Sequence, residues 1–251
     1  MIGIALSGGG ARGISHLGVL KALDENNITP NVMSGTSAGA IIGGFYSAGF
    51  TPDQILAIII KTKMLSIFKP AFSWQGLLSM DSLHKILKDN LPNTFESLKL
   101  PLIVAATAIE KGETHYFKEG DLHTAILASC CLPVLFNPVG IDEVKYIDGG
   151  ILNNLPVEPL VDKSDFIIAV GCNPISKTHT ISTFKDVMER SSLLAISKNT
   201  EKSKALASVF IEPPLLTNFS GFDLSKAQEI FETGYRYTSQ NIAIFAEKLK
   251  L

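Results

Sequence analysis

Short apolar runs alternate along this chain with segments that carry helical patterns, and this order constrains the fold most. The runs at residues 2–6, 32–34, 102–109 and 166–171 predict strands, and helical segments separate them. Strands joined through helices usually pair in parallel, and a parallel sheet needs cover on both faces. We therefore predict an α/β fold, a three-layer α/β/α arrangement with a mainly parallel central sheet, formed as a single domain by residues 1–251.

Several element boundaries follow from local signals. Thr51, Pro52 and Gln54 form a capping box with proline at the first helical position, which predicts a helix start. A Lys-Gly turn at residues 111–112 predicts that the third strand returns as an antiparallel hairpin through residues 114–117. The other expected helices cover residues 14–24, 38–48, 82–91, 183–202 and 224–248, one helix is capped by Asp121, and one further strand covers residues 209–211.

Composition excludes several classes of protein. With 46% hydrophobic residues and a net charge of −2, the chain is too apolar to be disordered. Lys and Arg total 22 against 24 Asp and Glu, without blocks of like charge, so nucleic acid is not an expected partner. Residues 32–50 lack charge, but their five glycines and turn signals predict a strand–turn–helix rather than a membrane span. Three cysteines without disulfide or metal spacing predict buried, reduced thiols in a cytoplasmic protein.

The first motif is GGGARG at residues 8–13, directly after the first expected strand and before a helix. Glycines let the backbone approach a ligand closely, and free N–H groups at a helix start favour an anion. The loop can cradle an oxyanion or a phosphate, because it also satisfies the dinucleotide pattern G-x-G-x-x-G. A dinucleotide site needs an acidic residue at the end of the second strand, but that strand ends in Ser34-Gly35. A non-catalytic phosphate- or nucleotide-binding module built on Gly8–Gly13 remains the alternative function.

The second motif is GTSAG at residues 35–39, a G-x-S-x-G between a strand and a helix. This is the context of a nucleophile elbow, in which a sharp turn exposes the serine oxygen and small neighbours make the turn possible. The helix N-terminus adds partial positive charge where an alkoxide forms. The alternative is a tight turn with a capping serine, but the strand–turn–helix context favours Ser37 as a nucleophile.

A nucleophilic serine needs a base, and none of the five histidines is a convincing one. On expected helices with polar neighbours, His84 and His123 are expected at the surface, as is His115 on the hairpin. His16 lies on the first helix, where packing or hydrogen bonding is its expected role. His179 is far enough along the chain for a Ser–Asp–His order, but its setting resembles a solvated loop.

The third motif, YIDGG at residues 146–150, supplies a different candidate. It places Asp148 at the end of a short apolar strand, and α/β sheets bind ligands beyond the carboxyl ends of their strands. The alternative is an ordinary Asp-Gly turn, which is common.

These three motifs, taken in this order, resemble those of the patatin-like phospholipase family, in its bacterial type. The flanking sequences agree over about the first 160 residues. They are HLGVL at residues 16–20 after the glycine loop, AS at 128–129 followed by Pro133 and by FNP at 136–138, and LNNLP at 152–156 after DGG. The family consists of serine acyl hydrolases that use a Ser–Asp dyad without histidine. The resemblance therefore implies cleavage of carboxylic esters of lipids, without a cofactor or a metal.

The resemblance also assigns roles to individual residues. Ser37 is the expected nucleophile and Asp148 the expected general base. The oxyanion hole is expected from the N–H groups of the loop, with a basic residue that steadies it, and glycines support the elbow and the turn. The loop residues are Gly8, Gly9, Gly10 and Arg12, and the supporting glycines are Gly35, Gly39, Gly149 and Gly150.

Residues 64–78 are dense in large apolar side chains and hold the single tryptophan, with lysines nearby. One interpretation is a flap over an acyl pocket that contacts lipid surfaces, where Trp and Lys are favoured, so that the protein is peripheral to a membrane. The alternative is an ordinary buried connection over the core. The expected partner in either case is a lipid or other acyl-ester substrate.

Overall fold

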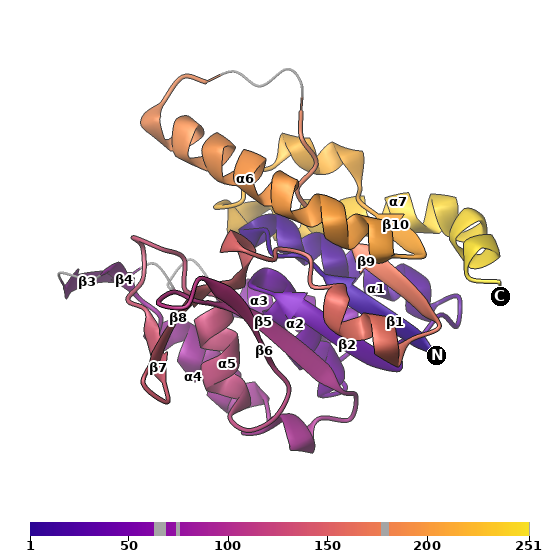
Figure 1. The fold of residues 1–251 in the computed structure, drawn as a ribbon. Coiled ribbons are helices and arrows are strands. Elements are labelled where there is room, and N and C mark those ends of the chain that lie inside the picture. Colours follow the sequence, from indigo (N-terminus) through magenta and orange to yellow (C-terminus); the bar gives the residue numbers. More distant parts are fainter. Residues whose placement is uncertain (63–68, 74–75, 177–180, 251) are drawn as a thin grey trace.

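The computed structural model describes residues 1–62, 69–73, 76–176 and 181–250, and these residues build a mixed eight-stranded sheet (Figure 1). Its strands are β1 (Ile2–Leu6), β2 (Val32–Thr36), β5 (Leu102–Ala108), β6 (Glu113–Phe117), β7 (Val139–Ile141), β8 (Val144–Asp148), β9 (Phe166–Val170) and β10 (Val209–Ile211). The order is β10-β9-β1-β2-β5-β8-β7, and β6 also pairs with β5. The strands from β10 to β5 are parallel to one another, whereas β6, β7 and β8 join antiparallel.

Helices occupy both sides of this sheet. The α-helices are α1 (Ser15–Asp24), α2 (Ala38–Ser47), α3 (Pro52–Lys61), α4 (Asp81–Asn90), α5 (Leu122–Ser129), α6 (Phe184–Leu206) and α7 (Ala227–Lys248). Short 3-10 helices are η1 (Gly10–Ile14), η3 (Phe95–Ser97), η4 (Gly149–Ile151), η5 (Glu158–Lys163), η6 (Pro214–Asn218) and η7 (Leu224–Lys226). No helix in the described ranges is long and apolar enough to cross a membrane.

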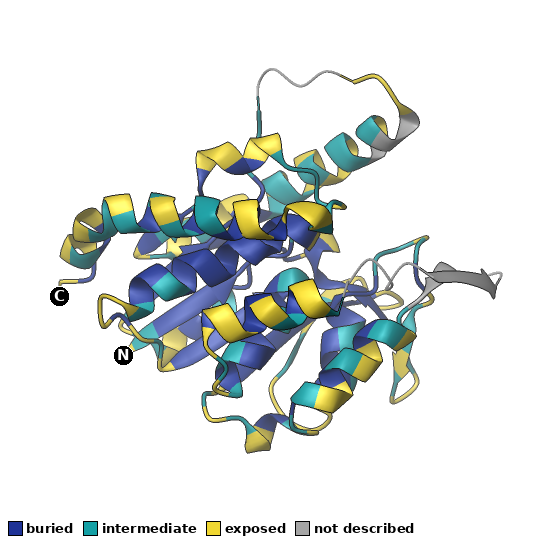
Figure 2. Ribbon diagram, turned by 180° about the vertical axis from the view of Figure 1, so that it is seen from behind, coloured by how far each residue is buried: buried dark blue, intermediate teal, exposed yellow. Residues whose placement is uncertain are grey.

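The alternation of side chains along the strands divides the core into two layers. One face of the sheet packs on the larger cluster, which includes residues of α1 to α5 and α7, through Ile4, Leu6, Met33, Val104, Ile168 and Val170. The other face packs on residues 155–160 through Ala5, Val32, Ile103, Ile167 and Ala169. In Figure 2 the central strands and α1 are mostly buried, and exposed residues lie on the outer side of α7. The predicted α/β fold with a mainly parallel sheet covered on both faces is confirmed.

Local signals in the sequence located most elements correctly. The Thr51 side chain accepts a hydrogen bond from the Gln54 N–H at 3.3 Å, and the Gln54 side chain accepts one from the Thr51 N–H at 2.9 Å. The predicted hairpin pairs β5 with β6 in antiparallel register. Residues 32–50 form β2 and α2, as the strand–turn–helix interpretation requires.

Two segments differ from the prediction or extend it. Strand β7 was not predicted, because its hairpin turn to β8 uses Asp142 and Glu143, both at positive φ, instead of the Asn-Gly or Asp-Gly pair that signals such a turn. Within residues 64–78, β3 (Lys69–Ser73) and β4 (Gly76–Ser79) pair with each other in a separate two-stranded sheet. The rest of that segment and its side chains lie outside the described residues, so both interpretations of it remain predictions.

Candidate active site

Ser37 occupies the sharp turn between β2 and α2. Its backbone has φ 53° and ψ −121°, a left-handed conformation that costs a residue with a side chain about 1–3 kcal/mol. The turn is so tight that a Cβ atom on Gly35 would lie 2.4 Å from the carbonyl oxygen of Gly39, and one on Gly39 would lie 2.3 Å from that of Leu6. Only glycine fits at either position, as the elbow interpretation requires.

A second serine holds the elbow in place. The Ser37 N–H donates to the Ser129 Oγ at 2.8 Å, and that hydroxyl donates to the carbonyl oxygen of Ala105 at 2.6 Å. Ser129 thus ties the backbone of Ser37 to the centre of β5. The sequence marked Ser129 only as part of the family resemblance, since nothing local connects it to residue 37.

The pairing of β5 explains how Ser37 meets Asp148. Strand β2 pairs with residues 102–105 of β5, and β8 pairs with residues 106–108. Because β6 occupies the opposite edge over residues 104–108, β2 and β8 must share one edge and approach each other end to end. Thr36 lies opposite Ala105 and Asp148 opposite Ala106, so the residue after Thr36 arrives beside the carboxylate.

The carboxyl group of Asp148 is buried, with 3% of the residue exposed. Its Oδ1 accepts a hydrogen bond from the Gly150 N–H at 2.7 Å, while Oδ2 has no partner of normal hydrogen-bond geometry in the described chain. Burial raises the pKa of Asp148 to about 6, and the Gly150 N–H and the Ser37 hydroxyl offset only part of that effect. The carboxylate is therefore a stronger base than an exposed aspartate, with a free oxygen beside the serine.

Cys130 also contacts the Ser37 side chain. Burial, together with the charge of Asp148, raises the pKa of its thiol well above the usual value. Cys130 therefore stays a neutral thiol at physiological pH, and a neutral thiol is a poor nucleophile.

The glycine loop lies directly against the elbow, since a Cβ atom on Gly8 would be 3.1 Å from that of Ser37. The predicted set of oxyanion donors needs one correction. The Gly8 N–H donates to the carbonyl oxygen of Asn154 at 3.0 Å and is therefore not free for a substrate. The N–H groups of Gly9 and Gly10 make no hydrogen bond within the described residues, and they remain the candidate donors of this loop.

Arg12 braces the loop from inside the protein. The residue is 4% exposed, and its Nη2 lies 2.5 Å from Oε1 of Glu189 on α6. The same Glu189 oxygen accepts the Gly221 N–H at 2.9 Å, and the Gly221 carbonyl accepts the Ala11 N–H at 2.8 Å. Burial alone would raise the pKa of Glu189, but the Gly221 N–H and the Arg12 charge outweigh it and keep the pKa below its usual value. This geometry supports a steadying role for Arg12, as the resemblance implies.

No histidine in the described part of the chain hydrogen-bonds to Ser37 or Asp148. His16 is fully buried, its Nε2 lies 2.8 Å from the Ser7 carbonyl oxygen, and burial lowers its pKa to about 4. The prediction of His123 as a surface residue is wrong, because it is 5% exposed and packs in the interior. The remaining histidines are His84 and His115, which are exposed as predicted, and His179, which lies outside the described residues.

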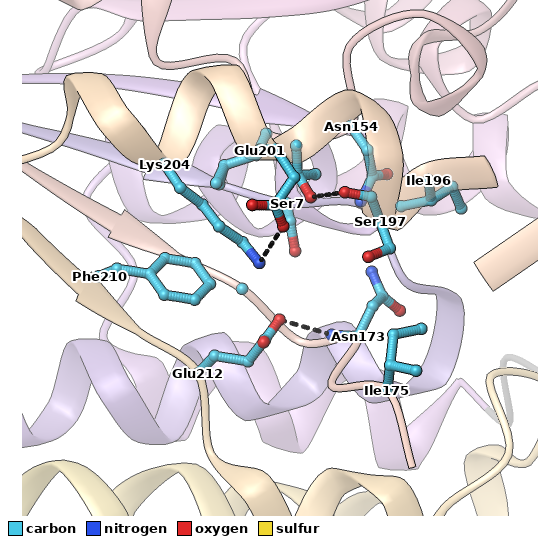
Figure 3. A pocket seen from close by; sticks show the side chains of 13 residues that line it. Ser7, Asn154, Asn173, Ile175, Ile196, Ser197, Glu201, Lys204, Phe210 and Glu212 are labelled. Carbon is cyan, nitrogen blue, oxygen red and sulfur yellow. Dashed lines mark hydrogen bonds and ion pairs between the residues drawn. The ribbon is translucent and has the colours of Figure 1, made fainter. Parts of the chain in front are cut away.

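A cavity of about 240 Å³ opens behind the glycine loop (Figure 3). Its walls include Ser7, Asn154 and Asn173, together with the charged residues Glu201 and Lys204 of α6 and Glu212, which follows β10. Ser37 and Asp148 are not among its lining residues. Among the described residues, no cluster of His, Cys, Asp or Glu could hold a metal ion, and the three cysteines are buried and unpaired.

The model of the family described as patatin-like phospholipase matches residues 4–161, which hold Ser37, Asp148 and the glycine loop. The chain belongs to this family. An uncharacterised NTE family protein of Mycobacterium tuberculosis is 32% identical over 68% of this chain and 49% of its own length. The lysophospholipase NTE1 of Kluyveromyces lactis is 27% identical over 100% of this chain and 20% of its own length.

The fold is similar to that of VipD from Legionella pneumophila, with a TM-score of 0.53 and 17% identity over 95% of this chain and 66% of VipD. Among the relatives matched by sequence, this patatin-like chain spans about half the length of the mycobacterial protein and a fifth of the yeast protein.

We expect Asp148→Asn to stabilise the fold near neutral pH. The folded pKa lies above the ordinary 3.8, so ionising this carboxyl costs stability, by about 3 kcal/mol once the pH is above about 6. Asparagine keeps an oxygen for the Gly150 N–H but carries no charge. Urea denaturation between about pH 4 and pH 8 should show a gain that shrinks as the pH falls through 6.

The control for that experiment is Asp162→Asn, which alters an exposed carboxylate and should leave stability nearly unchanged. An Asp148→Asn protein that is less stable than wild type at neutral pH would contradict the buried carboxylate with a raised pKa described above.

Proposed function

We propose that this patatin-like protein is a serine acyl hydrolase that cleaves carboxylic esters of lipids through an acyl-enzyme on Ser37, with Asp148 as the general base. The observation that carries the proposal is the strained Ser37 placed end to end with a buried carboxyl whose pKa is about 6. A phosphate-binding loop needs neither the strain nor the carboxylate. A binding module is therefore the weaker alternative.

The proposed chemistry uses the same groups in both half-reactions. Ser37 Oγ attacks the ester carbonyl and passes its proton to Asp148, while the N–H groups of Gly9 and Gly10 receive the developing oxyanion. Collapse of the tetrahedral intermediate breaks the ester bond, and Asp148 gives its proton to the leaving alcohol. Water then attacks the acyl-enzyme with Asp148 again as base, which frees the fatty acid and the serine.

The raised pKa of Asp148 makes this base workable. A carboxylate of ordinary pKa is a weak acceptor for a hydroxyl proton, and general-base catalysis improves as the pKa of the base approaches the working pH. The pKa of about 6 brings Asp148 closer to neutrality, although it remains ionised at pH 7. The rest of the barrier lowering is assigned to the preorganised N–H groups of the loop.

Exposed apolar side chains beside the site support a lipid substrate. Ile151 and Leu152, which follow the Asp148 turn, are 50% and 39% exposed. Val134 is 69% exposed at φ +70°, a strained value for a β-branched residue, and it lies three residues after Cys131, whose carbonyl accepts the Asp148 N–H. Relatives named as lysophospholipases point the same way. Contact of residues 64–78 with a membrane surface belongs to this proposal as well.

We expect Ser37→Ala to lose esterase activity on p-nitrophenyl butyrate and to lose labelling by a fluorophosphonate, because no other serine or threonine in the described ranges has the positive φ of an elbow. The control is Ser225→Ala, an exposed serine, which should behave as wild type. Retained labelling in Ser37→Ala would remove Ser37 as the nucleophile. If neither wild type nor variant is labelled, while the loop binds a nucleotide, the binding module is the better description.

The pH profile tests the base. The carboxylate form of Asp148 is the active one, so kcat/KM should be constant above about pH 6 and fall tenfold per pH unit well below it. Because a histidine would titrate at a similar pH, variants decide between them. Asp148→Asn should be nearly inactive, whereas His179→Ala should keep wild-type kcat/KM; the reverse pattern would replace the dyad with a histidine-based triad.

The apolar rim predicts chain-length selectivity. Leu152→Ser should lower kcat/KM for a dodecanoyl ester by about tenfold, through loss of roughly 1.4 kcal/mol of apolar contact, and change that for an acetyl ester little. Leu215→Ser is the matched control, since Leu215 is 65% exposed on η6 and far along the chain from the site. Equal losses on both esters would show that Leu152 does not contact the acyl chain.

A further inference from the structure

We infer that Asn173, assisted by Asn154, is a positioning residue for the oxyanion hole: it clamps the carbonyl of Gly8 and thereby turns the Gly9 N–H out as a donor. This inference rests on the proposed acyl-transfer function. It starts from an unusual concentration of hydrogen bonds on one peptide group of the glycine loop.

The Gly8 carbonyl oxygen is surrounded by donors on one side. Asn173 Nδ2 donates to it at 2.6 Å, Asn154 Nδ2 at 3.2 Å and the Cys172 Sγ at 3.4 Å. The two asparagines are 9% and 2% exposed, so their amides are shielded from water. A carbonyl with two lone pairs that meets three donors is held more firmly than loop geometry alone requires.

Holding this carbonyl fixes the next N–H. The Gly8 carbonyl and the Gly9 N–H belong to one planar peptide unit, which is trans, so the two groups point in opposite directions. A clamp on the oxygen therefore aims the Gly9 N–H away from the asparagines. That N–H makes no hydrogen bond in the described structure, as a donor reserved for a substrate oxyanion should.

The two asparagines reach the Gly8 carbonyl from the cavity. Asn154 and Asn173 both line the cavity behind the loop, where neither Ser37 nor Asp148 appears (Figure 3). The loop itself lies against the nucleophile, with the Cβ position of Gly8 3.1 Å from that of Ser37. The two asparagines and the catalytic serine thus contact the same short loop, and the asparagines also line the cavity.

The two asparagines are held from different elements. The Asn173 N–H donates to Glu212 Oε1 at 3.3 Å, at the end of β10. The Asn154 N–H donates to Asn199 Oδ1 at 3.2 Å on α6, and Asn199 Nδ2 donates to the Gly150 carbonyl at 2.9 Å. Asn154 is therefore coupled to the Asp148 turn as well as to the loop, whereas Asn173 acts on the loop alone and is the cleaner residue to change.

The test is Asn173→Leu, which removes the donor and keeps most of the volume, so that water does not replace the amide. We expect kcat to fall about 10- to 100-fold, which is no more than the fall caused by removing a whole oxyanion donor. KM should change less than about twofold. The affinity for a trifluoromethyl ketone, whose adduct carries an oxyanion, should fall by the same factor as kcat/KM. Thr200→Val is the control, because Thr200 lines the same cavity and bonds only to Ser197 in its own helix.

A measurement on the wild-type protein keeps the inference testable if the variant does not fold. The amide resonance of Gly9 should shift downfield when the ketone binds, while that of Gly8, already bonded to Asn154, should shift little. A Gly9 amide resonance that does not shift when the ketone binds would overturn the inference. So would a folded Asn173→Leu protein with wild-type kcat and ketone affinity, in a chain whose Ser37→Ala variant is inactive. Full activity of Ser37→Ala would instead refute the proposed function itself.

Discussion

Strand β5 pairs with both β2 and β8 along a single edge, so that β2 ends at Ser37 and β8 ends at Asp148. Every other part of the site depends on this arrangement. It places residue 37, just after the end of β2, next to residue 148, at the end of β8. It also requires glycine at the elbow, because neighbouring backbone atoms leave no room for a Cβ atom there. It also places Asp148 in the interior of the sheet, where burial raises its pKa to about 6.

The site therefore combines two locally unfavourable features on a strongly stabilised frame. Ser37 adopts a left-handed backbone conformation, and Asp148 is ionised at neutral pH with one oxygen lacking a normal hydrogen bond. Apolar layers on both faces of the sheet and the Ser129 bridge to β5 hold these features in place. The Arg12–Glu189 pair does the same for the glycine loop through Gly221, and the asparagines do so through the Gly8 carbonyl. Both halves of the site are thus held by hydrogen bonds without a substrate, as the proposed electrostatic catalysis requires.

Local sequence signals predicted the parts of this structure that depend on neighbouring residues. The strand–turn–helix around Ser37, the capping box at Thr51 and the strand end at Asp148 follow from turn chemistry and apolar periodicity. What the sequence did not reveal depends on contacts between distant segments. Burial of His123, the Ser129 bridge and the use of the Gly8 N–H by Asn154 arise only when the sheet is assembled. The β7 turn was missed for a different reason, since Asp142 and Glu143 give no local signal for positive φ.

The central claim is that Ser37, Asp148 and the N–H groups of Gly9 and Gly10 form one catalytic unit. A crystal structure of the protein after reaction with a fluorophosphonate tests it most directly. The account predicts phosphorus bonded to Ser37 Oγ, a phosphonyl oxygen about 3 Å from both loop nitrogens, and a carboxylate oxygen of Asp148 beside the modified serine. An adduct on another residue, or a phosphonyl oxygen directed away from the glycine loop, would contradict it.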